Sequence, residues 1–290
     1  MKKILVTGAS GQLGSEIRFL SGGYSQYAFT YTDSAELDIT DRAAVQKQAQ
    51  ENGYYAIINC AAYTAVDKAE TDKEKAYLIN ATGAANLAAA AAATGAKFVH
   101  VSTDFIFDGT HSQPILEDDQ PNPLSVYGAS KLEGEVQVLK ANPDTLLIRT
   151  SWVYSSYGAN FVKTILRLCR ERDSLNVIFD QIGTPTYARD LAAFILSALD
   201  TATEQKIGGV FHYSNEGVAS WYDFAIAIRD IAGLKTKISP IETSQYPTPA
   251  VRPKYSVLNK GKIKKAFGIV IPYWRASLQN AMEIILKEQA

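Results

Sequence analysis

The sequence predicts an α/β fold in which a doubly wound parallel sheet is followed by a smaller α/β lobe. In the first half, short runs rich in β-branched residues alternate with longer segments of helical pattern, and those runs are almost continuously apolar. Apolar strands separated by helices are typical of a parallel sheet that is covered on both faces. Because crossovers between parallel strands are right-handed, the expected core is of the Rossmann type.

Residues 1–151 account for the sheet in this prediction. The expected strands cover residues 2–8, 27–32, 55–61, 97–103 and 145–151. The expected helices cover residues 11–21, 41–52, 67–93 and 124–141, and Gly83 is the candidate break point of the third.

Beyond residue 151 the alternation loosens. The expected elements are a helix at 158–172, a strand at 175–179, a helix at 188–200, a strand at 208–214 and a helix that begins near Trp221. Three prolines make residues 244–259 a shaped loop. We therefore expect residues 152–290 to form mainly a second lobe on the carboxyl edge of the sheet, with some of the chain crossing back to the sheet.

The composition excludes several classes of function. The chain has 290 residues, of which 47% are hydrophobic and 20% charged, and its formal net charge is −1. It therefore offers no strongly basic surface to nucleic acid. No apolar run reaches the roughly 18 residues of a membrane span, and the N-terminus lacks the apolar core of a signal peptide. We expect a cytoplasmic protein without membrane or nucleic-acid partners.

The cysteines and histidines are predicted to be structural. Cys60 and Cys169 lie far apart without a CxxC pattern, which fits small buried side chains in a reducing compartment. His100, His111 and His212 are scattered, and no spacing of His, Cys and carboxylates indicates a zinc site.

A glycine-rich segment follows the first expected strand. Gly8, Gly11 and Gly14 have the spacing GxxGxxG between a strand and a helix. Such a loop turns sharply, lets the backbone approach a pyrophosphate and allows close packing of helix on sheet. The N–H groups that open the following helix then face the phosphates. Residues 1–151 are therefore predicted to be a dinucleotide-binding domain.

The segment after the second expected strand bears on the choice of cofactor. It contains Asp33, Glu36 and Asp38 and no basic residue before Arg42. An acidic residue at this place favours the free ribose hydroxyl of NADH over the 2′-phosphate of NADPH. The end of the strand is fixed only to within a few positions, so the sequence leaves both cofactors open.

Tyr127 and Lys131 lie four positions apart at the start of an expected helix and therefore on one face. A free tyrosine has a pKa of about 10, and a neighbouring ammonium lowers it by stabilising the phenolate. Ser102 and Thr103 end the strand 97–103, where a reacting carbonyl would sit. A Tyr–x3–Lys pair alone is usually a solvated helix face. Beside the glycine loop and a hydroxyl at the end of this strand, the pair of Tyr127 and Lys131 is predicted to be catalytic.

Seven segments of the chain resemble one enzyme family. They are NCAAYTAVDKAETD (59–72), LINATG (78–83), STDFIFDG (102–109), NPLSVYGASKLEGE (122–135), IRTSWVY (148–154), NFVKTILRL (160–168) and YPTPAVRPKYSVLN (246–259). On these motifs the chain is similar to the dTDP-4-dehydrorhamnose reductases, within the extended short-chain dehydrogenase/reductase superfamily. The similarity runs from the glycine loop to about residue 260.

The resemblance implies reduction of dTDP-4-dehydro-6-deoxy-L-mannose to dTDP-L-rhamnose, a precursor of cell-surface polysaccharide, with NADPH or NADH. It implies that Tyr127 donates a proton to the C4 oxygen, that Lys131 tunes Tyr127 and holds the nicotinamide ribose, and that Thr103 hydrogen-bonds near the same oxygen. With the loop glycines, the candidates for cofactor binding are Gly8, Gly11, Gln12, Leu13, Gly14, Asp38, Ile39, Ala61, Ala62, Tyr63, Tyr127 and Lys131. The candidates for substrate binding are Thr103, Asp104, Trp152 and Arg252.

Several of these assignments keep an alternative. Trp152 also fits a core aromatic residue, and Arg252 also fits a surface salt bridge. Some members of the family are dimers bridged by Mg²⁺ held by glutamates; Glu16 matches one such position, but Arg189 stands at another. A cation is not held beside an arginine with its ligand missing. We therefore expect no metal and leave a homodimer open.

Two other functions compete with the reductase. One is a non-catalytic nucleotide-binding regulatory subunit, against which the intact set of Thr103, Tyr127 and Lys131 argues. The other is a reductase or epimerase for a different nucleotide sugar, which would share these residues and differ in the second lobe.

Overall fold

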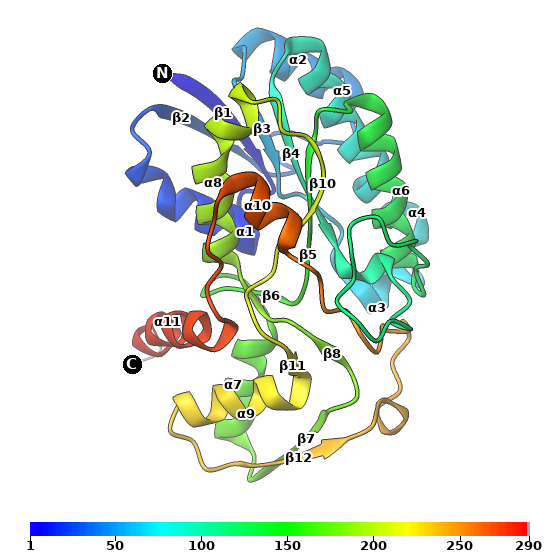
Figure 1. The fold of residues 1–290 in the computed structure, drawn as a ribbon, viewed down its shortest axis with the longest axis vertical. Helices are drawn as coiled ribbons and strands as arrows, with labels where there is room; N and C mark the ends of the chain where they lie inside the picture. Colours follow the sequence, from blue (N-terminus) through cyan, green and yellow to red (C-terminus); the bar gives the residue numbers. More distant parts are fainter. Residues whose placement is uncertain (289–290) are drawn as a thin grey trace.

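The computed structural model describes residues 1–288, and its centre is a parallel sheet of six strands (Figure 1). In spatial order the strands are β10 (Gly209–His212), β5 (Leu146–Thr150), β4 (Lys97–Thr103), β3 (Ala56–Asn59), β1 (Lys2–Thr7) and β2 (Tyr27–Thr32). Every neighbouring pair is parallel, so all carboxyl ends meet at one edge. The predicted fold class is confirmed.

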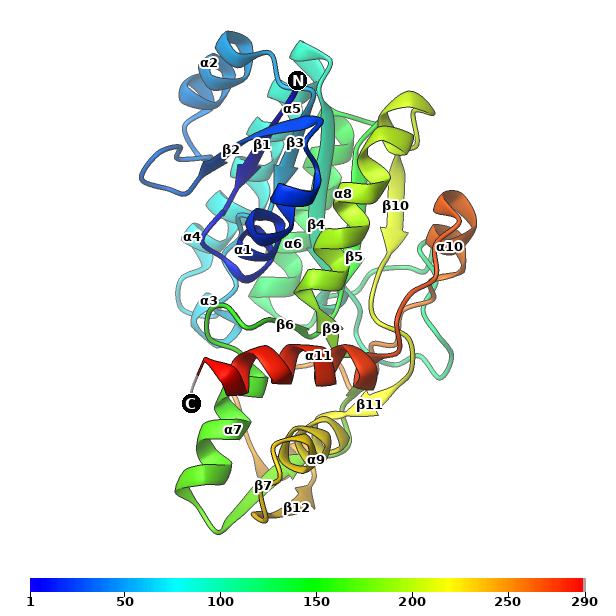
Figure 2. The ribbon, with the colours of Figure 1, turned by 90° about the vertical axis from the view of Figure 1, so that its left-hand side faces the viewer.

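Helices cover both faces of this sheet. One face carries α1 (Gln12–Leu20) and α8 (Ala188–Glu204), which lie nearer the viewer in Figure 2; the other carries α2 (Arg42–Asn52), α5 (Ala84–Thr94) and α6 (Val126–Ala141). Val6 packs in one hydrophobic cluster with Ile17 of α1, and its neighbour Leu5 packs in another with Leu87 of α5. Adjacent strand residues point to opposite faces, which explains the nearly continuous apolar strands.

The second lobe lies beyond the carboxyl edge of the sheet (Figure 1). Its helices are α7 (Phe161–Glu171), α9 (Trp221–Ile231) and α11 (Trp274–Lys287), and its strand pairs are β7 (Ser174–Ile178) with β12 (Lys237–Ile241), β8 (Ile182–Gly183) with β11 (Ala219–Ser220), and β6 (Val153–Tyr154) with β9 (Thr186–Tyr187). Leu166, Phe224 and Met282 belong to its separate hydrophobic cluster. Within residues 1–288, no helix is long and apolar enough to span a bilayer.

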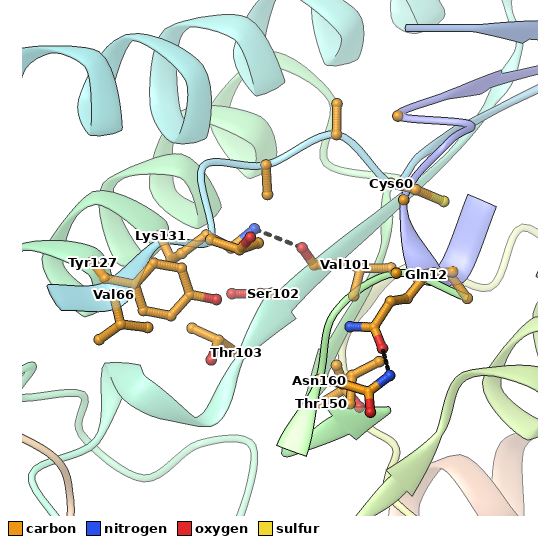
Figure 3. A pocket seen from close by; sticks show the side chains of 18 of the residues that line it. Gln12, Cys60, Val66, Val101, Ser102, Thr103, Tyr127, Lys131, Thr150 and Asn160 are labelled. Atoms are coloured by element: carbon orange, nitrogen blue, oxygen red, sulfur yellow. Dashed lines mark hydrogen bonds between the residues drawn. The ribbon is translucent and has the colours of Figure 1, made fainter. Parts of the chain in front are cut away.

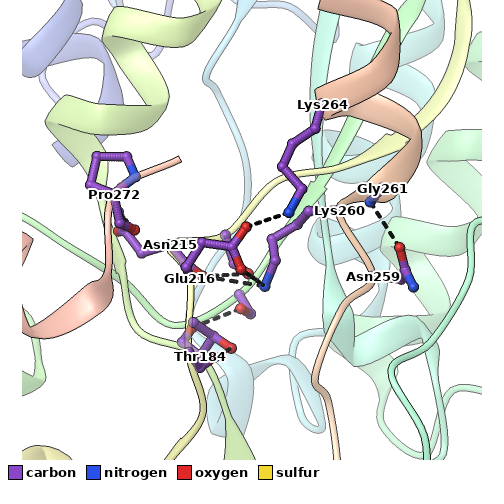
Figure 4. Close-up of polar contacts among 11 residues, drawn as sticks. Thr184, Asn215, Glu216, Asn259, Lys260, Gly261, Lys264 and Pro272 are labelled. Atoms are coloured by element: carbon purple, nitrogen blue, oxygen red, sulfur yellow. Dashed lines mark hydrogen bonds and ion pairs between the residues drawn. The ribbon is translucent and has the colours of Figure 1, made fainter. Parts of the chain in front are cut away.

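A polar cluster fastens the chain where it leaves β10 (Figure 4). Glu216 pairs with Lys264 of α10 (Gly261–Phe267) at 2.8 Å and with the buried Lys260 at 3.6 Å. Its backbone N–H donates to the carbonyl oxygen of Pro272 at 2.8 Å, just before α11. The chain that follows β10 is thereby tied both to α10 beside the sheet and to the second lobe.

The helix expected over residues 67–93 is divided at a different place from Gly83. The structure has α3 (Val66–Ala69), α4 (Lys73–Tyr77) and a π-helical turn, η2 (Leu78–Gly83), which continues into α5. Gly83 keeps right-handed helical angles, and the chain instead leaves the helix at residues 70–72. The carboxylate of Glu70 there accepts the N–H of Val126 at 2.9 Å in the first turn of α6. This contact across 56 positions is invisible to local periodicity.

The loops after β1 and β3 touch at the point where the strand order reverses. β1 pairs with β2 on one side and with β3 on the other, and such a switch point leaves a crevice at the carboxyl edge. Gly8 has a φ of +65°, and a Cβ atom added there would lie 2.5 Å from the nitrogen of Ala61. Only glycine satisfies both the backbone angle and the close approach.

We predict that Gly8→Ala lowers the free energy of unfolding by roughly 2–5 kcal/mol, since it adds a left-handed backbone penalty to an overpacked contact. Gly53 is the matched control, because its φ is +58° and an added Cβ would meet nothing within 4 Å. Gly53→Ala should cost only about 1–2 kcal/mol. Urea denaturation of both variants measures the difference. Equal losses would show that the contact with Ala61 contributes nothing.

Candidate active site

A cleft of about 970 Å³ opens at the carboxyl edge of the sheet, between the strand ends and the second lobe. Segments that follow β1, β2, β3, β4 and β5 line one side. Residues 158–161, Trp221, Phe224 and Arg252 line the other. Parallel α/β sheets bind ligands at this edge, so the cleft is the candidate site.

Most of the residues predicted from the sequence line this cleft. They are Gly8, Gly11, Gln12, Leu13, Asp38, Ile39, Ala61, Ala62, Thr103, Asp104, Tyr127, Lys131, Trp152 and Arg252. Ser102, Asp33 and Cys60 line it as well. Cys60, predicted to be buried, is half-buried.

Gly14 and Tyr63, two of the cofactor candidates, do not line the cleft and support its wall from behind. A Cβ atom on Gly14 would lie 2.6 Å from the Cα atom of Ala9, so Gly14 lets α1 pack on the loop. The backbone N–H and C=O of Tyr63 bond the amide of Asn80 at 2.8 and 3.1 Å, and its hydroxyl donates to Asp72 at 3.1 Å.

The end of the cleft beside β1 and β2 has the chemistry of a dinucleotide site. α1 begins after Gly11 without a side-chain cap, which leaves its first N–H groups to phosphate oxygens. Asp33 accepts the N–H of Ser10 at 3.1 Å and stands just after β2. The hydroxyl and N–H of Thr40 donate to Asp38 and lower the pKa of that carboxyl. Acidic side chains here suit ribose hydroxyls.

The three predicted catalytic residues come together at the end of β4 (Figure 3). Tyr127 and Lys131 lie one turn apart on α6, and Thr103 is the last residue of β4. The hydroxyl of Ser125 caps α6 and so fixes its first turn. The ammonium of Lys131 donates to the carbonyl oxygen of Val101 at 2.7 Å, which ties the helix to the strand.

The pKa of Tyr127 differs from the sequence-based expectation. Burial raises it to about 12, a hydrogen bond with Thr103 lowers it, and the charge of Asp104 raises it. Burial is the largest of these influences, so the pKa is raised although Lys131 lies one turn away on the same helix. Burial also lowers the pKa of Lys131 to about 8, while Glu135 opposes that shift. The phenol is therefore protonated at neutral pH, as a proton donor must be.

Asp104 is a buried acid that faces the cleft. Burial raises its pKa to about 6, while hydrogen bonds from Ser256 and Thr103 lower it. The hydroxyl of Thr103 donates to Oδ1 at 3.1 Å, and Oδ2 has no partner among residues 1–288. A buried carboxylate oxygen without a partner is costly, which disfavours the charged form of Asp104.

Trp152 and Arg252 both line the cleft, and each also makes the structural contact that the sequence left open as an alternative. Trp152 is half-buried, lines the cleft and stacks on Trp221 with ring centroids 3.6 Å apart. Arg252 also lines the cleft, and its Nη1 and Nη2 donate to the two carboxylate oxygens of Asp67 at 3.0 and 2.7 Å. The salt bridge joins α3 to the proline-containing loop, and it lowers the pKa of Asp67.

Several cleft residues were not found from the sequence. Trp221 opens α9, and Asn160 opens α7 and donates to Gln12 at 3.0 Å. Asn160 is an N-cap residue and Trp221 follows one, so the sequence marks the start of a helix at both places. No local signal shows that these helix starts face a distant loop. Only the three-dimensional arrangement brings them to the cleft.

Glu16 is fully buried and bound to an arginine. Its Oε2 accepts Nε of Arg189 at 2.7 Å, and its Oε1 accepts the hydroxyl of Ser155 at 2.6 Å. Across the described part of the chain, no three His, Cys, Asp or Glu side chains gather in a metal-binding cluster.

Comparisons with known proteins agree on one family. The family model described as "RmlD substrate binding domain" matches residues 1–286. A dTDP-4-dehydrorhamnose reductase from Aggregatibacter actinomycetemcomitans is 42% identical over 97% of this chain and 98% of its own length. The crystal structure of such a reductase from Clostridium acetobutylicum is 45% identical with a TM-score of 0.94, covering 98% of this chain and 99% of its own. The Bacillus anthracis enzyme, solved in complex with NADP, is 38% identical with a TM-score of 0.93, covering 98% and 100%.

We predict that the free energy of unfolding of Asp104→Asn increases relative to that of the native chain as the pH rises. The pKa of Asp104 is raised from 3.8 to about 6, so the folded protein binds this proton more tightly than the unfolded chain does. Its contribution to stability is present below about pH 4 and lost as the pH rises through about 6. The difference in unfolding free energy between variant and native chain should therefore grow by about 3 kcal/mol over this window. Urea denaturation across the window tests this; a difference independent of pH would contradict it.

Proposed function

Since this chain belongs to the dTDP-4-dehydrorhamnose reductase family, we propose that it reduces the C4 ketone of dTDP-4-dehydro-6-deoxy-L-mannose to dTDP-L-rhamnose. The observation that carries the proposal is the meeting of Thr103, Tyr127 and Lys131 at one point of the cleft. A regulatory subunit would have no need of this arrangement.

The nucleotide end of the cleft fits NADPH or NADH, which supplies the hydride when bound. The uncapped start of α1 and the glycine loop suit its diphosphate, and Asp33 suits a ribose hydroxyl. Lys131 lies between this end and Tyr127 and is proposed to hold the nicotinamide ribose. Ala61 and Ala62 offer small side chains along the same wall.

Tyr127 is proposed to donate the proton. Reduction adds a hydride to carbon C4 and a proton to its oxygen, and the raised pKa keeps that proton on the phenol until it is needed. Thr103 lowers the pKa of the phenol, and its hydroxyl, which donates to Oδ1 of Asp104 in this structure, is proposed to turn to the substrate oxygen when the sugar is bound. The phenolate that remains after transfer is stabilised by Thr103 and by the positive charge of Lys131.

Arg252 is proposed to bind the diphosphate of the sugar nucleotide without leaving Asp67. Its Nη1 and Nη2 meet Asp67 end-on, and Nη1 also bonds Thr248 (2.6 Å) and the carbonyl of Ala250 (3.0 Å). A guanidinium has five N–H donors, so Nε–H and one Nη2–H remain along its other edge. Two parallel donors of this kind match phosphate oxygens.

The wider assignments are proposed on the same basis. Residues 1–151 bind the dinucleotide, and residues 152–290 supply most contacts to the sugar nucleotide, with Asp104 and Trp152 beside the sugar. The reaction takes place in the cytoplasm. A homodimer stays a prediction that light scattering can test.

We predict that Tyr127→Phe lowers kcat roughly 10²–10⁴-fold, the usual contribution of a general acid. The substitution removes only the hydroxyl, so the affinity for NADPH, measured by calorimetry, should hardly change. Turnover is measured as substrate-dependent oxidation of NADPH and of NADH. Tyr24→Phe, outside the lining of the cleft, is the control. Near-native turnover by Tyr127→Phe would refute the mechanism, and no turnover by the native enzyme would refute the function.

We predict that Arg252→Lys raises KM for the sugar nucleotide roughly tenfold or more and leaves KM for NADPH unchanged, because lysine keeps the charge and loses the two-pronged contact. Lys254→Arg, at an exposed residue of the same loop, is the control and should change neither constant. Steady-state kinetics with each substrate varied in turn makes the comparison. Equal changes in both KM values would show that Arg252 acts on the fold of the loop instead.

A further inference from the structure

Trp152 has a backbone conformation that bulky residues avoid. Its φ is +47°, in the left-handed region that favours glycine. The neighbouring chain holds it there: the carbonyl of Trp152 accepts the N–H of Thr186 at 3.1 Å, and the hydroxyl of Ser151 donates to the carbonyl of Thr184 at 2.8 Å. Strain of this kind persists where the surroundings over-determine it, and it concentrates at functional sites.

The indole of Trp152 fits between two partners. On one face it stacks on Trp221, with a centroid separation of 3.6 Å and an angle of 8° between the planes. At its edge lies Gly183, where an added Cβ atom would come within 2.7 Å of Cε2 and 2.8 Å of Cζ2. Any side chain larger than hydrogen at position 183 would therefore push the ring aside.

Trp221 is itself held in place by several contacts. It is the first residue of α9 and lies between Ser220 and Asp223, whose capping box fixes the start of the helix. Its indole Nε1 donates to Gln181 Oε1 at 3.1 Å, and Phe161 packs on it at 4.7 Å. Gln181 is buried, and its side-chain nitrogen Nε2 donates to the hydroxyl of Thr243 at 3.2 Å. The ring plane of Trp221 is therefore fixed from several sides.

We infer that Trp221 is a positioning residue for the sugar-nucleotide site: it holds the indole of Trp152, whose backbone the neighbouring chain fixes in the left-handed conformation, in place as a wall of the cleft. The inference rests on the proposed function, because the wall matters only if the nucleotide sugar lies against it. Trp221 acts through Trp152, so its effect disappears where Trp152 is absent.

A double-mutant cycle tests this dependence. Trp221→Leu should raise KM for the sugar nucleotide roughly tenfold, the scale expected when an aromatic stack is lost, and leave KM for NADPH unchanged. Trp152→Leu should do the same, and the double variant should be no worse than Trp152→Leu alone. Trp221→Phe, which keeps a ring for stacking, should recover most of the native KM.

Two further variants separate positioning from folding. Gly183→Ala should raise the same KM with Trp221 intact, because the added methyl displaces the Trp152 ring. Trp274→Phe is the control, since Trp274 belongs to the same hydrophobic cluster and does not line the cleft. Its KM values should match those of the native enzyme, and thermal unfolding establishes that each variant is folded.

The outcomes distinguish this inference from the proposed function. If the native enzyme does not reduce the sugar nucleotide, the proposed function fails and the inference falls with it. If the native enzyme is active but Trp221→Leu leaves KM unchanged, or its effect adds in full to that of Trp152→Leu, only the inference is overturned.

Discussion

The amide of Asn59 ties the carboxyl ends of three neighbouring strands together, and the cleft depends on their alignment. Its oxygen accepts the hydroxyl of Thr7 at 2.8 Å and the N–H of Ala61 at 3.0 Å, so its nitrogen must donate to Nδ1 of His100 at 3.0 Å. The imidazole then carries its proton on Nε2, and burial, together with the charge of Lys131, lowers the pKa of His100 and keeps it neutral. The glycine loop follows Thr7, the cofactor wall begins at Ala61, and Thr103 lies three residues beyond His100. The buried amide of Asn59 therefore fixes the relative positions of the segments that carry the glycine loop, Ala61 and Thr103.

Burial is the common cause of the electrostatics around this edge. It disfavours the charged form of every group, and so it raises the pKa of Tyr127 and Asp104 and lowers that of Lys131. The resulting site has a protonated phenol that can give up its proton and a nearby ammonium that can steady the anion left behind. Lys131 keeps its charge at neutral pH because Glu135, one turn further along α6, opposes the effect of burial.

Local signals in the sequence were sufficient for the six strands of the central sheet, the glycine loop and the pair of Tyr127 and Lys131, because periodicity and spacing encode them within a few residues. The short strands of the second lobe, and β12, were missed. Contacts between distant segments were not predictable in this way. Glu70 bonds Val126 across 56 positions, Asp67 is the partner of Arg252, and Trp221 stacks on Trp152 from a distant part of the chain. The pKa of Tyr127 went in the opposite direction to the expectation because spacing reveals a neighbouring charge but not the depth of burial.

The polar contacts between the two halves of the chain indicate that the cleft is preformed. Ser155 bonds the buried Glu16, Asn160 bonds Gln12, and Arg252 pairs with Asp67, so the second half of the chain is anchored to the first at both ends of the cleft. Separating the lobes would break all three and leave the carboxylate of Glu16 buried with one partner fewer, at a cost of roughly 1–3 kcal/mol for each polar group left unpaired. A hinge motion that opens the whole cleft is therefore expensive. A cleft held in this way admits a ligand without a hinge motion, and the side chains of the second lobe that line it are in place beforehand.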